Sequence, residues 1–475
     1  MINTGKFQGS DKTHIKEIIL LIADKYFPHD WDDLNNIFAQ IFGFDVNNIN
    51  AESINAIYDI SDLFFSILKQ QNKKRTLSTR TRFYKMKDHY IKMLTNFYEK
   101  YSNIFMQNYE KIENELVLNK FFNLVIILDK TLLLLIDCSF NINDLSKDQN
   151  YIKLLKNSLN KGEFILKTLS ANNTSKPLKI LFQKNLSSLI KYISKVQNSF
   201  PILLFDDFNQ YLNLLLSVLI NLEKFNENNI KITLYALFKV FNTQLYKDNL
   251  KEDSFDGNNT FKENTPVKNN TVRKANNLKG VALIVSPTKL KNYESEIISV
   301  SNKFNEYFND ETLLKLLDIN LSLIPAFFKI HSHNNLSEID LFLGETDDEI
   351  FPTDVFSDNT MDWQIIHRSL LRSIFETFTI FSLKYLKNKL DLLFKNPQLI
   401  EGNFSEFEAI VNFANCVPFL YKEGIIVEIN MGLIDFIKFI TFIQKLAGTN
   451  ELFLRIYITT IAKWSDLFIL SKIKN

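Results

Sequence analysis

The chain has 475 residues, of which 46% are hydrophobic, and its formal net charge is +1. It contains only 11 Gly and 9 Pro, well below the usual shares of about 7% and 5%. So few turn-forming residues exclude sandwiches, barrels and doubly wound sheets, which need many tight turns. The near-zero charge excludes a global field that would attract nucleic acid or a membrane surface. Long helices joined by short polar loops are therefore expected.

The cysteines and the apolar runs of the sequence indicate in which cellular compartment the protein is expected. The two cysteines, Cys138 and Cys416, lie in apolar runs of helical pattern and do not suggest a disulfide framework, so a reducing compartment is expected. The longest apolar run, residues 121–136, is interrupted by Asp129 and Lys130 and is too short to span a bilayer. No signal peptide pattern precedes it. We expect a soluble intracellular protein.

Apolar periodicity is helical along most of the chain. From the N-terminus onward it predicts helices over residues 14–26, 31–42, 51–71, 79–107, 111–137, 147–169, 175–198, 201–223, 227–247, 289–308, 310–330, 362–395, 404–421, 424–446 and 450–473. The apolar run at residues 281–285 is too short for a helix of its own and is expected to be either a strand-like stub or the edge of a helix; no other strand is expected.

Two of these segments show a clear apolar face. The first face consists of Ile54, Ile57, Ser61, Phe64 and Leu68, and the second of Ile91, Leu94, Tyr98, Tyr101 and Phe105. Most helices come in pairs with short connections, and such pairs bury their faces against their neighbours in the stack. The expected fold is therefore all-α, a HEAT-repeat α-solenoid of about seven antiparallel helix pairs.

Composition divides the chain into three parts. Residues 1–247 are predicted to form N-terminal HEAT-like repeats. Residues 248–280 are rich in Asn, Lys, Asp and Thr and are predicted to be a disordered insertion. Residues 281–475 are predicted to form further HEAT-like repeats, with residues 331–361 as an acidic loop.

The sequence shows no pattern of an enzyme site. It has no Gly-rich phosphate loop, no Cys-x-x-Cys pair and no His-Glu-x-x-His. His331 and His333 lie close together, but Zn²⁺ needs three or four ligands, so these are interpreted as loop histidines. No catalytic residue, cofactor or metal is expected, and an enzyme would need a convergent polar site that the sequence does not reveal.

Two charged segments are candidate interaction sites. Residues 73–92 hold eight Lys or Arg and one acid, which fits an acidic or nucleic-acid partner or, more simply, a solvated loop and helix face. The acidic cluster contains Glu345, Asp347, Asp348 and Glu349. Closely set carboxylates produce a strong local potential, so this cluster either binds a basic partner or is a solvated loop tip.

The break between the first two predicted helices has the pattern of a known type of helix turn. An apolar helix stops at Pro28, and Trp31 opens the next one, in the run Tyr26-Phe27-Pro28-His29-Asp30-Trp31. This unit resembles an early HEAT repeat of the importin-beta superfamily, where an aromatic-Pro-x-x-Trp turn joins two antiparallel helices. Trp31 is interpreted as a packing residue between its own helix and the preceding one rather than as a contact residue.

Further segments are similar, in order, to the importin-eleven branch of these karyopherins. They are residues 59–107 with the run Leu63 to Lys69, Arg82-Phe83-Tyr84 and Phe105-Met106-Gln107; residues 310–351 with Leu336 to Leu341 and Asp347 to Phe351; and Leu452 to Arg455 through Ala462-Lys463-Trp464. The family has a proline after the acidic pair, which this chain lacks. Family members are also about twice as long and usually acidic.

The resemblance implies a nuclear transport receptor that carries protein cargo through the nuclear pore under control of the Ran GTPase. It implies phenylalanine-glycine nucleoporins as partners, contact with Ran or cargo at the acidic cluster, and no direct nucleic acid or membrane partner. It also implies a location in cytoplasm, nucleus and nuclear pore. The chain corresponds to a middle portion of such receptors, so Ran binding is expected to be weakened. The alternative is a HEAT-repeat scaffold or adaptor for complex assembly or trafficking.

Overall fold

A computed structural model provides the fold of this chain. It describes residues 9–27, 31–42, 51–73, 77–112, 114–137, 149–171, 174–199, 207–242, 307–331, 363–396, 404–418, 433–448 and 451–473. Within these ranges there are fifteen α-helices and two 3-10 turns, and no strand. The all-α prediction is therefore confirmed for the part of the chain that the structure describes.

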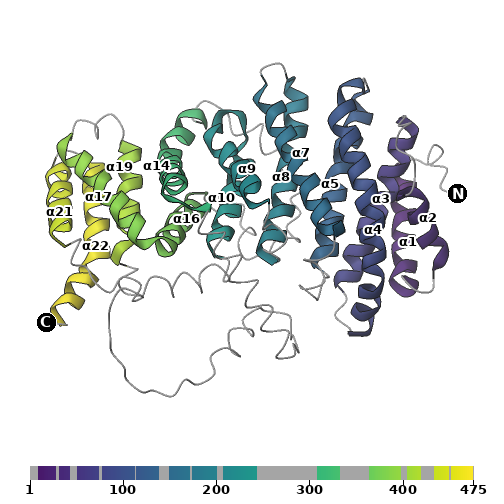
Figure 1. The fold of residues 1–475 in the computed structure, drawn as a ribbon, viewed down its shortest axis with the longest axis horizontal. Coiled ribbons are helices and arrows are strands. Elements are labelled where there is room, and N and C mark those ends of the chain that lie inside the picture. Colours follow the sequence, from purple (N-terminus) through teal and green to yellow (C-terminus); the bar gives the residue numbers. More distant parts are fainter. Residues whose placement is uncertain are drawn as a thin grey trace. The chain divides into compact units, whose positions relative to one another are not determined.

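The described residues divide into two compact units, one ending at Ser217 and the other beginning at Val218. The first contains α1 (Gly9–Tyr26), α2 (Asp32–Phe42), α3 (Ala51–Lys73), α4 (Leu77–Asn108), α5 (Glu115–Asp137), α7 (Gln149–Ser170), α8 (Lys176–Ser199) and most of α9 (Phe208–Ile220) (Figure 1). The second contains α10 (Glu227–Asn242), α14 (Asp310–His331), α16 (Trp363–Thr377), α17 (Thr379–Lys395), α19 (Phe404–Ala414), α21 (Leu433–Ala447) and α22 (Glu451–Ile473).

Helices of the first unit pack against neighbours in a regular order. Helix α3 contacts α1 and α5, and α5 in turn contacts α8, so these four helices form one series. Helices α2, α4 and α7 form a second series, in which α4 contacts both of the others. Contacts between α2 and α3, α4 and α5, and α7 and α8 join the two series. Most of these helices thus pack on the next helix of their own series, which is the next but one along the chain, and on a neighbour in the other series.

The predicted apolar faces form the core of this unit. All ten residues of the two faces predicted in α3 and α4 are buried, and Phe105 is fully enclosed. Phe105 contacts Tyr109, Phe121, Phe122, Phe164 and Phe182, with ring centroids 4.9–6.4 Å apart. Further ring contacts continue this aromatic cluster to Phe27 at the end of α1. Burial of large aromatic side chains is a dominant source of core stability.

The N-terminal helix break lies where the sequence predicted it. Helix α1 ends at Tyr26 and α2 begins at Asp32, although residues 28–30 lie outside the described part. Buried Phe27 stacks on Tyr90 at 6.1 Å and meets Phe38 edge-on at 6.4 Å. Trp31 is only half-buried, and its carbonyl accepts a hydrogen bond from the Asn35 amide. Phe27 therefore supplies the enclosed aromatic contact at this break.

In the second unit, α10 contacts α16, α14 contacts α19, α17 contacts both α19 and α21, and α19 and α21 both contact α22. Residues 362–395 were predicted as one helix, and this is wrong, because the helix breaks at Phe378 with φ −122° and ψ 57°. The hydroxyls of Thr377 and Thr379 donate to the carbonyls of Ser373 and Phe375, four residues back. Such hydroxyl bonds bend helices.

Several predicted helix ends were also inaccurate. The helix predicted from residue 111 begins at Glu115, since the Asn114 side chain caps it by accepting from the amides of Leu116 (3.0 Å) and Val117 (3.2 Å). The helix predicted over residues 404–421 ends at Ala414, and Cys416 follows in a turn. The predictions for residues 248–280, 281–285 and 289–306 lie outside the described residues.

Gly162 allows α7 and α9 to approach closely. A Cβ at this position would lie 2.3 Å from Leu214 Cδ1 and 2.9 Å from Leu189 Cδ2. We therefore expect Gly162→Ala to lower the free energy of unfolding by about 1–3 kcal/mol, the usual cost of overpacking, despite alanine's higher helix propensity. Gly448→Ala is the control, because a Cβ there meets only the Lys445 carbonyl at 3.6 Å. Equal urea denaturation midpoints for the two variants would contradict this packing.

Candidate functional site

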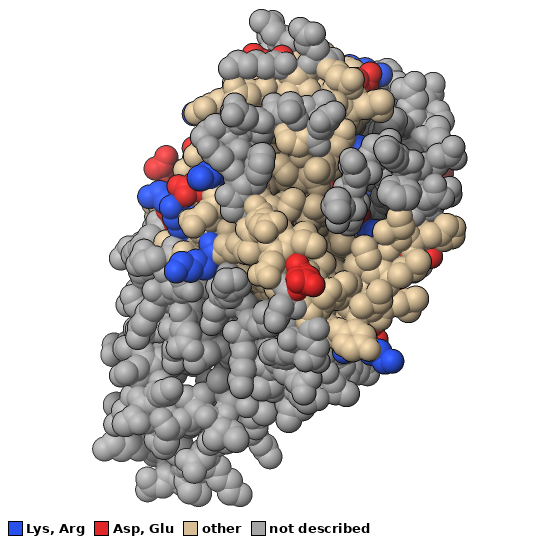
Figure 2. Space-filling model, turned by 90° about the vertical axis from the view of Figure 1, so that its right-hand side faces the viewer, with Lys and Arg blue, Asp and Glu red and all other residues tan. Residues whose placement is uncertain are grey.

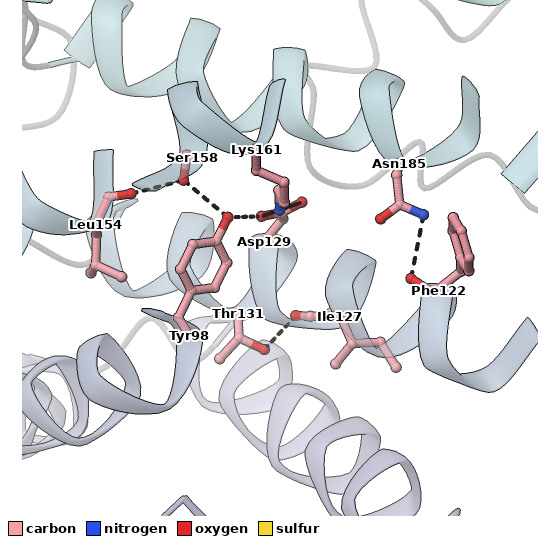
Figure 3. A network of polar contacts seen from close by, with 9 residues as sticks. All are labelled: Tyr98, Phe122, Ile127, Asp129, Thr131, Leu154, Ser158, Lys161 and Asn185. Atoms are coloured by element: carbon pink, nitrogen blue, oxygen red, sulfur yellow. Dashed lines mark hydrogen bonds and ion pairs between the residues drawn. The ribbon is translucent and has the colours of Figure 1, made fainter. Parts of the chain in front are cut away.

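A buried polar network joins three helices of the first unit. Asp129 of α5 and Lys161 of α7 form an ion pair in which neither side chain is exposed. Lys161 Nζ donates to both carboxylate oxygens of Asp129, at 2.8 and 3.0 Å. Tyr98 of α4 donates its hydroxyl proton to the same carboxylate at 2.7 Å (Figure 3). One carboxylate therefore connects α4, α5 and α7.

Most hydrogen-bond donors of Lys161, Tyr98 and Ser158 have an acceptor within the network. Lys161 has three donors, of which two point to Asp129, and its ammonium lies 4.8 Å from the centre of the Tyr98 ring, an attractive arrangement. Ser158 lies 3.0 Å from the Tyr98 hydroxyl and 2.9 Å from the Leu154 carbonyl oxygen. Since Tyr98 gives its proton to Asp129, the one proton of Ser158 serves either Tyr98 or Leu154.

Burial dominates the electrostatics of the network. It raises the pKa of Asp129 and lowers the pKa of Lys161, while the attraction between the two groups opposes both shifts. Burial also raises the pKa of Tyr98, and the nearby negative charge of Asp129 adds to this. A phenol that stays protonated remains a donor to the carboxylate. Because all of these groups are enclosed, they hold helices together and do not present a reactive surface to a substrate.

The second unit contains smaller polar contacts of the same kind. Tyr385 of α17 donates to Asp318 of α14 at 2.6 Å, and Lys389 lies 2.8 Å from the same carboxylate. Burial is the largest of the effects that raise the pKa of Tyr385, and the hydrogen bond to the Asp318 carboxylate is the second.

At the last helix, the buried Trp464 indole donates to the Asn415 side-chain oxygen at 3.0 Å. Nearby, the pKa of Cys416 is raised to about 12, mainly by burial. A thiol with so high a pKa is a poor nucleophile at neutral pH.

Most residues singled out in the sequence lie outside the described residues. This applies to Glu345, Asp347, Asp348 and Glu349 of the acidic cluster and to His333. His331 is the last residue of α14, and its side chain is not described. Helix α4 runs through most of residues 73–92, but the side chains of residues 72–89 are not described either. The interaction sites proposed for these two segments stay predictions.

Sequence reasoning did not find the buried network. One signal was present, because Asp129 interrupts the apolar run of residues 121–136, all of whose described apolar side chains proved to be buried or nearly so. A carboxylate in such a run needs a buried partner. Its partner could not be identified, since Lys161 lies 32 positions away and looks like any other lysine on a helix.

Within the described residues, no helix is long and apolar enough to cross a membrane, and no group of three or more His, Cys, Asp or Glu is arranged to hold a metal ion. Comparisons with known proteins add no further constraint. Neither a protein-family model, nor a curated protein sequence, nor a solved structure matches this chain.

Proposed function

We propose that this chain is a HEAT-type helical-repeat protein whose function is to bind other proteins. The observation that carries the proposal is the order of helix contacts in the first unit, where α1, α3, α5 and α8 follow one another and α2, α4 and α7 run beside them. Packing on the next helix but one, in two parallel series, is what stacked helix pairs require. Stacks of this kind function mainly through the extended surfaces that they present.

Within this class we propose a nuclear transport receptor. Support comes from the Tyr26 to Trp31 helix break and from the ordered similarity to karyopherin repeats through Trp464. The placement of α1 and α2 on either side of that break agrees with the proposal. In such a receptor, protein cargo, phenylalanine-glycine nucleoporins and Ran-GTP bind at separate places on the stack. An adaptor for complex assembly or trafficking is the alternative, and it would share the same helix packing.

Binding to nucleoporin repeats separates the two proposals. A transport receptor should be retained on immobilised phenylalanine-glycine repeats and released by soluble repeats, because aromatic side chains enter shallow apolar grooves and many weak contacts together give avidity. Repeats in which every Phe is replaced by Ser are the matched control and should not retain the chain. Equal retention on both columns, or none on either, would contradict the receptor and favour the adaptor.

A further inference from the structure

Helix α5 is apolar on nearly every side. All described side chains of residues 121–135 are buried except those of Asn123 and Lys130, which are half-buried. Burial of apolar side chains has no direction of its own, so most rotations of such a helix about its axis enclose a similar apolar area. Apolar burial therefore determines the rotation of α5 only weakly.

Other helices of the first unit turn charged side chains toward solvent. Lys153, Lys156 and Glu163 of α7 are exposed. Charged groups are also visible at the described surface on the side of the molecule where α1 and α2 lie (Figure 2). A helix with one polar and one apolar side has one favoured rotation. The half-buried Lys120 and Lys130 of α5 constrain it less, because long lysine side chains reach water from several rotations.

One charged side chain of α5 does have a fixed direction. Among the described side chains of this helix, Asp129 is the one charged group that is buried. Its short side chain contacts the Lys161 ammonium of α7 at 2.8 Å and the Tyr98 hydroxyl of α4 at 2.7 Å (Figure 3). We call Tyr98, Asp129 and Lys161 the buried triad. Rotation of α5 would separate the carboxylate from both partners and leave opposite charges enclosed and unpaired, which is strongly destabilising.

We propose that the buried triad selects the rotation of α5 in the stack while adding little net stability. The attraction within a buried ion pair roughly balances its desolvation cost, but only one arrangement of the helices forms the pair. Apolar contacts tolerate rearrangement, and a core loses its unique arrangement before it loses stability. The buried triad thereby determines that the edge of α5 with Asn123 and Lys130 is turned toward the surface.

The second unit contains the same three groups in a more open setting. Tyr385 donates to Asp318 at 2.6 Å, and the Lys389 ammonium lies 2.8 Å from that carboxylate and 5.3 Å from the centre of the Tyr385 ring. We call these residues the open triad, since the Asp318 side chain is 46% exposed. Helix α14, which carries Asp318, already has two distinct sides. Its exposed side includes Glu311, Lys315 and Ser322, and its buried side includes Leu313, Leu317 and Leu321.

Thiol labelling at two positions of α5 measures its rotation. Asn123 and Val125 lie about 200° apart around the helix axis. Asn123 is half-buried, whereas Val125 is 1% exposed. A cysteine is introduced at one of these positions at a time, and peptide mass spectrometry identifies the labelled residue, so that Cys138 and Cys416 do not interfere.

The two labelling rates should differ in wild type and converge when the buried triad is removed. In the otherwise wild-type chain, Asn123→Cys should react about tenfold or more faster than Val125→Cys, because Val125 is reached only through local opening. In the variant Asp129→Leu with Lys161→Met, the two rates should lie within about threefold of each other, because more than one rotation is then populated. Similar rates in the wild-type background, or a difference that persists in the variant, would overturn the proposal.

The open triad provides the matched control. Asp318→Leu with Lys389→Met removes the same charges, but Lys315→Cys should still react about tenfold or more faster than Leu317→Cys, because the two sides of α14 fix its rotation. Equal loss of the rate difference in both units would contradict selection by the buried triad. So would loss of a cooperative urea transition when the buried triad is removed, since the triad would then stabilise the fold and not select a rotation.

Discussion

Replacing Lys161 with Met is expected to destabilise the protein by about 3–5 kcal/mol, the cost of removing one partner from a buried ion pair. Asp129 would remain enclosed and would keep the hydrogen bond from the Tyr98 hydroxyl, but it would lose the ammonium that balances its charge. The methionine chain fills most of the lysine volume, so the loss comes from the uncompensated carboxylate and not from a cavity. Urea denaturation followed by circular dichroism measures it.

Two variants test this explanation. Lys153 also lies on α7 and forms an ion pair with Glu99 of α4 at 2.6 Å, but its side chain is 49% exposed. Lys153→Met should therefore cost less than about 1 kcal/mol. The double variant Asp129→Leu with Lys161→Met removes both charges and should recover most of the stability lost in the single variant. If Lys153→Met and Lys161→Met were equally destabilising, burial would not be the cause.

Truncating Phe105 to alanine is expected to cost about 3–5 kcal/mol, the range for deleting a buried aromatic side chain. Phe105 is fully enclosed and contacts rings from α5, α7 and α8 as well as Tyr109. Its removal would leave a cavity that these four elements share and that none of them can fill alone. Thermal and urea unfolding of the full chain measure the loss.

A half-buried phenylalanine provides the control. Phe394 of α17 is half-buried and its ring meets Phe442 at 5.2 Å. Phe394→Ala should cost clearly less than Phe105→Ala, because less apolar area leaves the solvent when that ring packs. Similar losses for both variants would show that Phe105 is not the centre of the aromatic cluster.

Helix content and core faces could be predicted from the sequence because they follow from periodicity. Every apolar residue predicted on the faces of α3 and α4 is buried, since a spacing of three and four residues places side chains on one side of a helix. Helix ends were predicted where the chain gives a local signal, as at Pro28. They were missed where the signal was an asparagine cap, as at Asn114, or a pair of threonines, as around Phe378.

The buried network could not be predicted, for a physical reason. Asp129 and Lys161 lie on different helices, and only the packing of α5 on its neighbours brings them together. The exposure of four apolar side chains of α1 was also missed, because the pattern Ile18, Leu21, Ile22 and Tyr26 looks the same whether the helix buries that side or exposes it. Sequence periodicity identifies an apolar face but does not reveal what covers it.

Hydrogen exchange measured by mass spectrometry tests the central claim, that the helices form a stack in which each pair depends on its neighbours. In such a stack, a destabilised pair affects those next to it and little beyond. We predict that Lys161→Met accelerates amide exchange in α4, α5, α7 and α8, while α19, α21 and α22 in the second unit exchange as in wild type. Equal acceleration in all of these helices would show one cooperative core instead and would contradict the repeat stack.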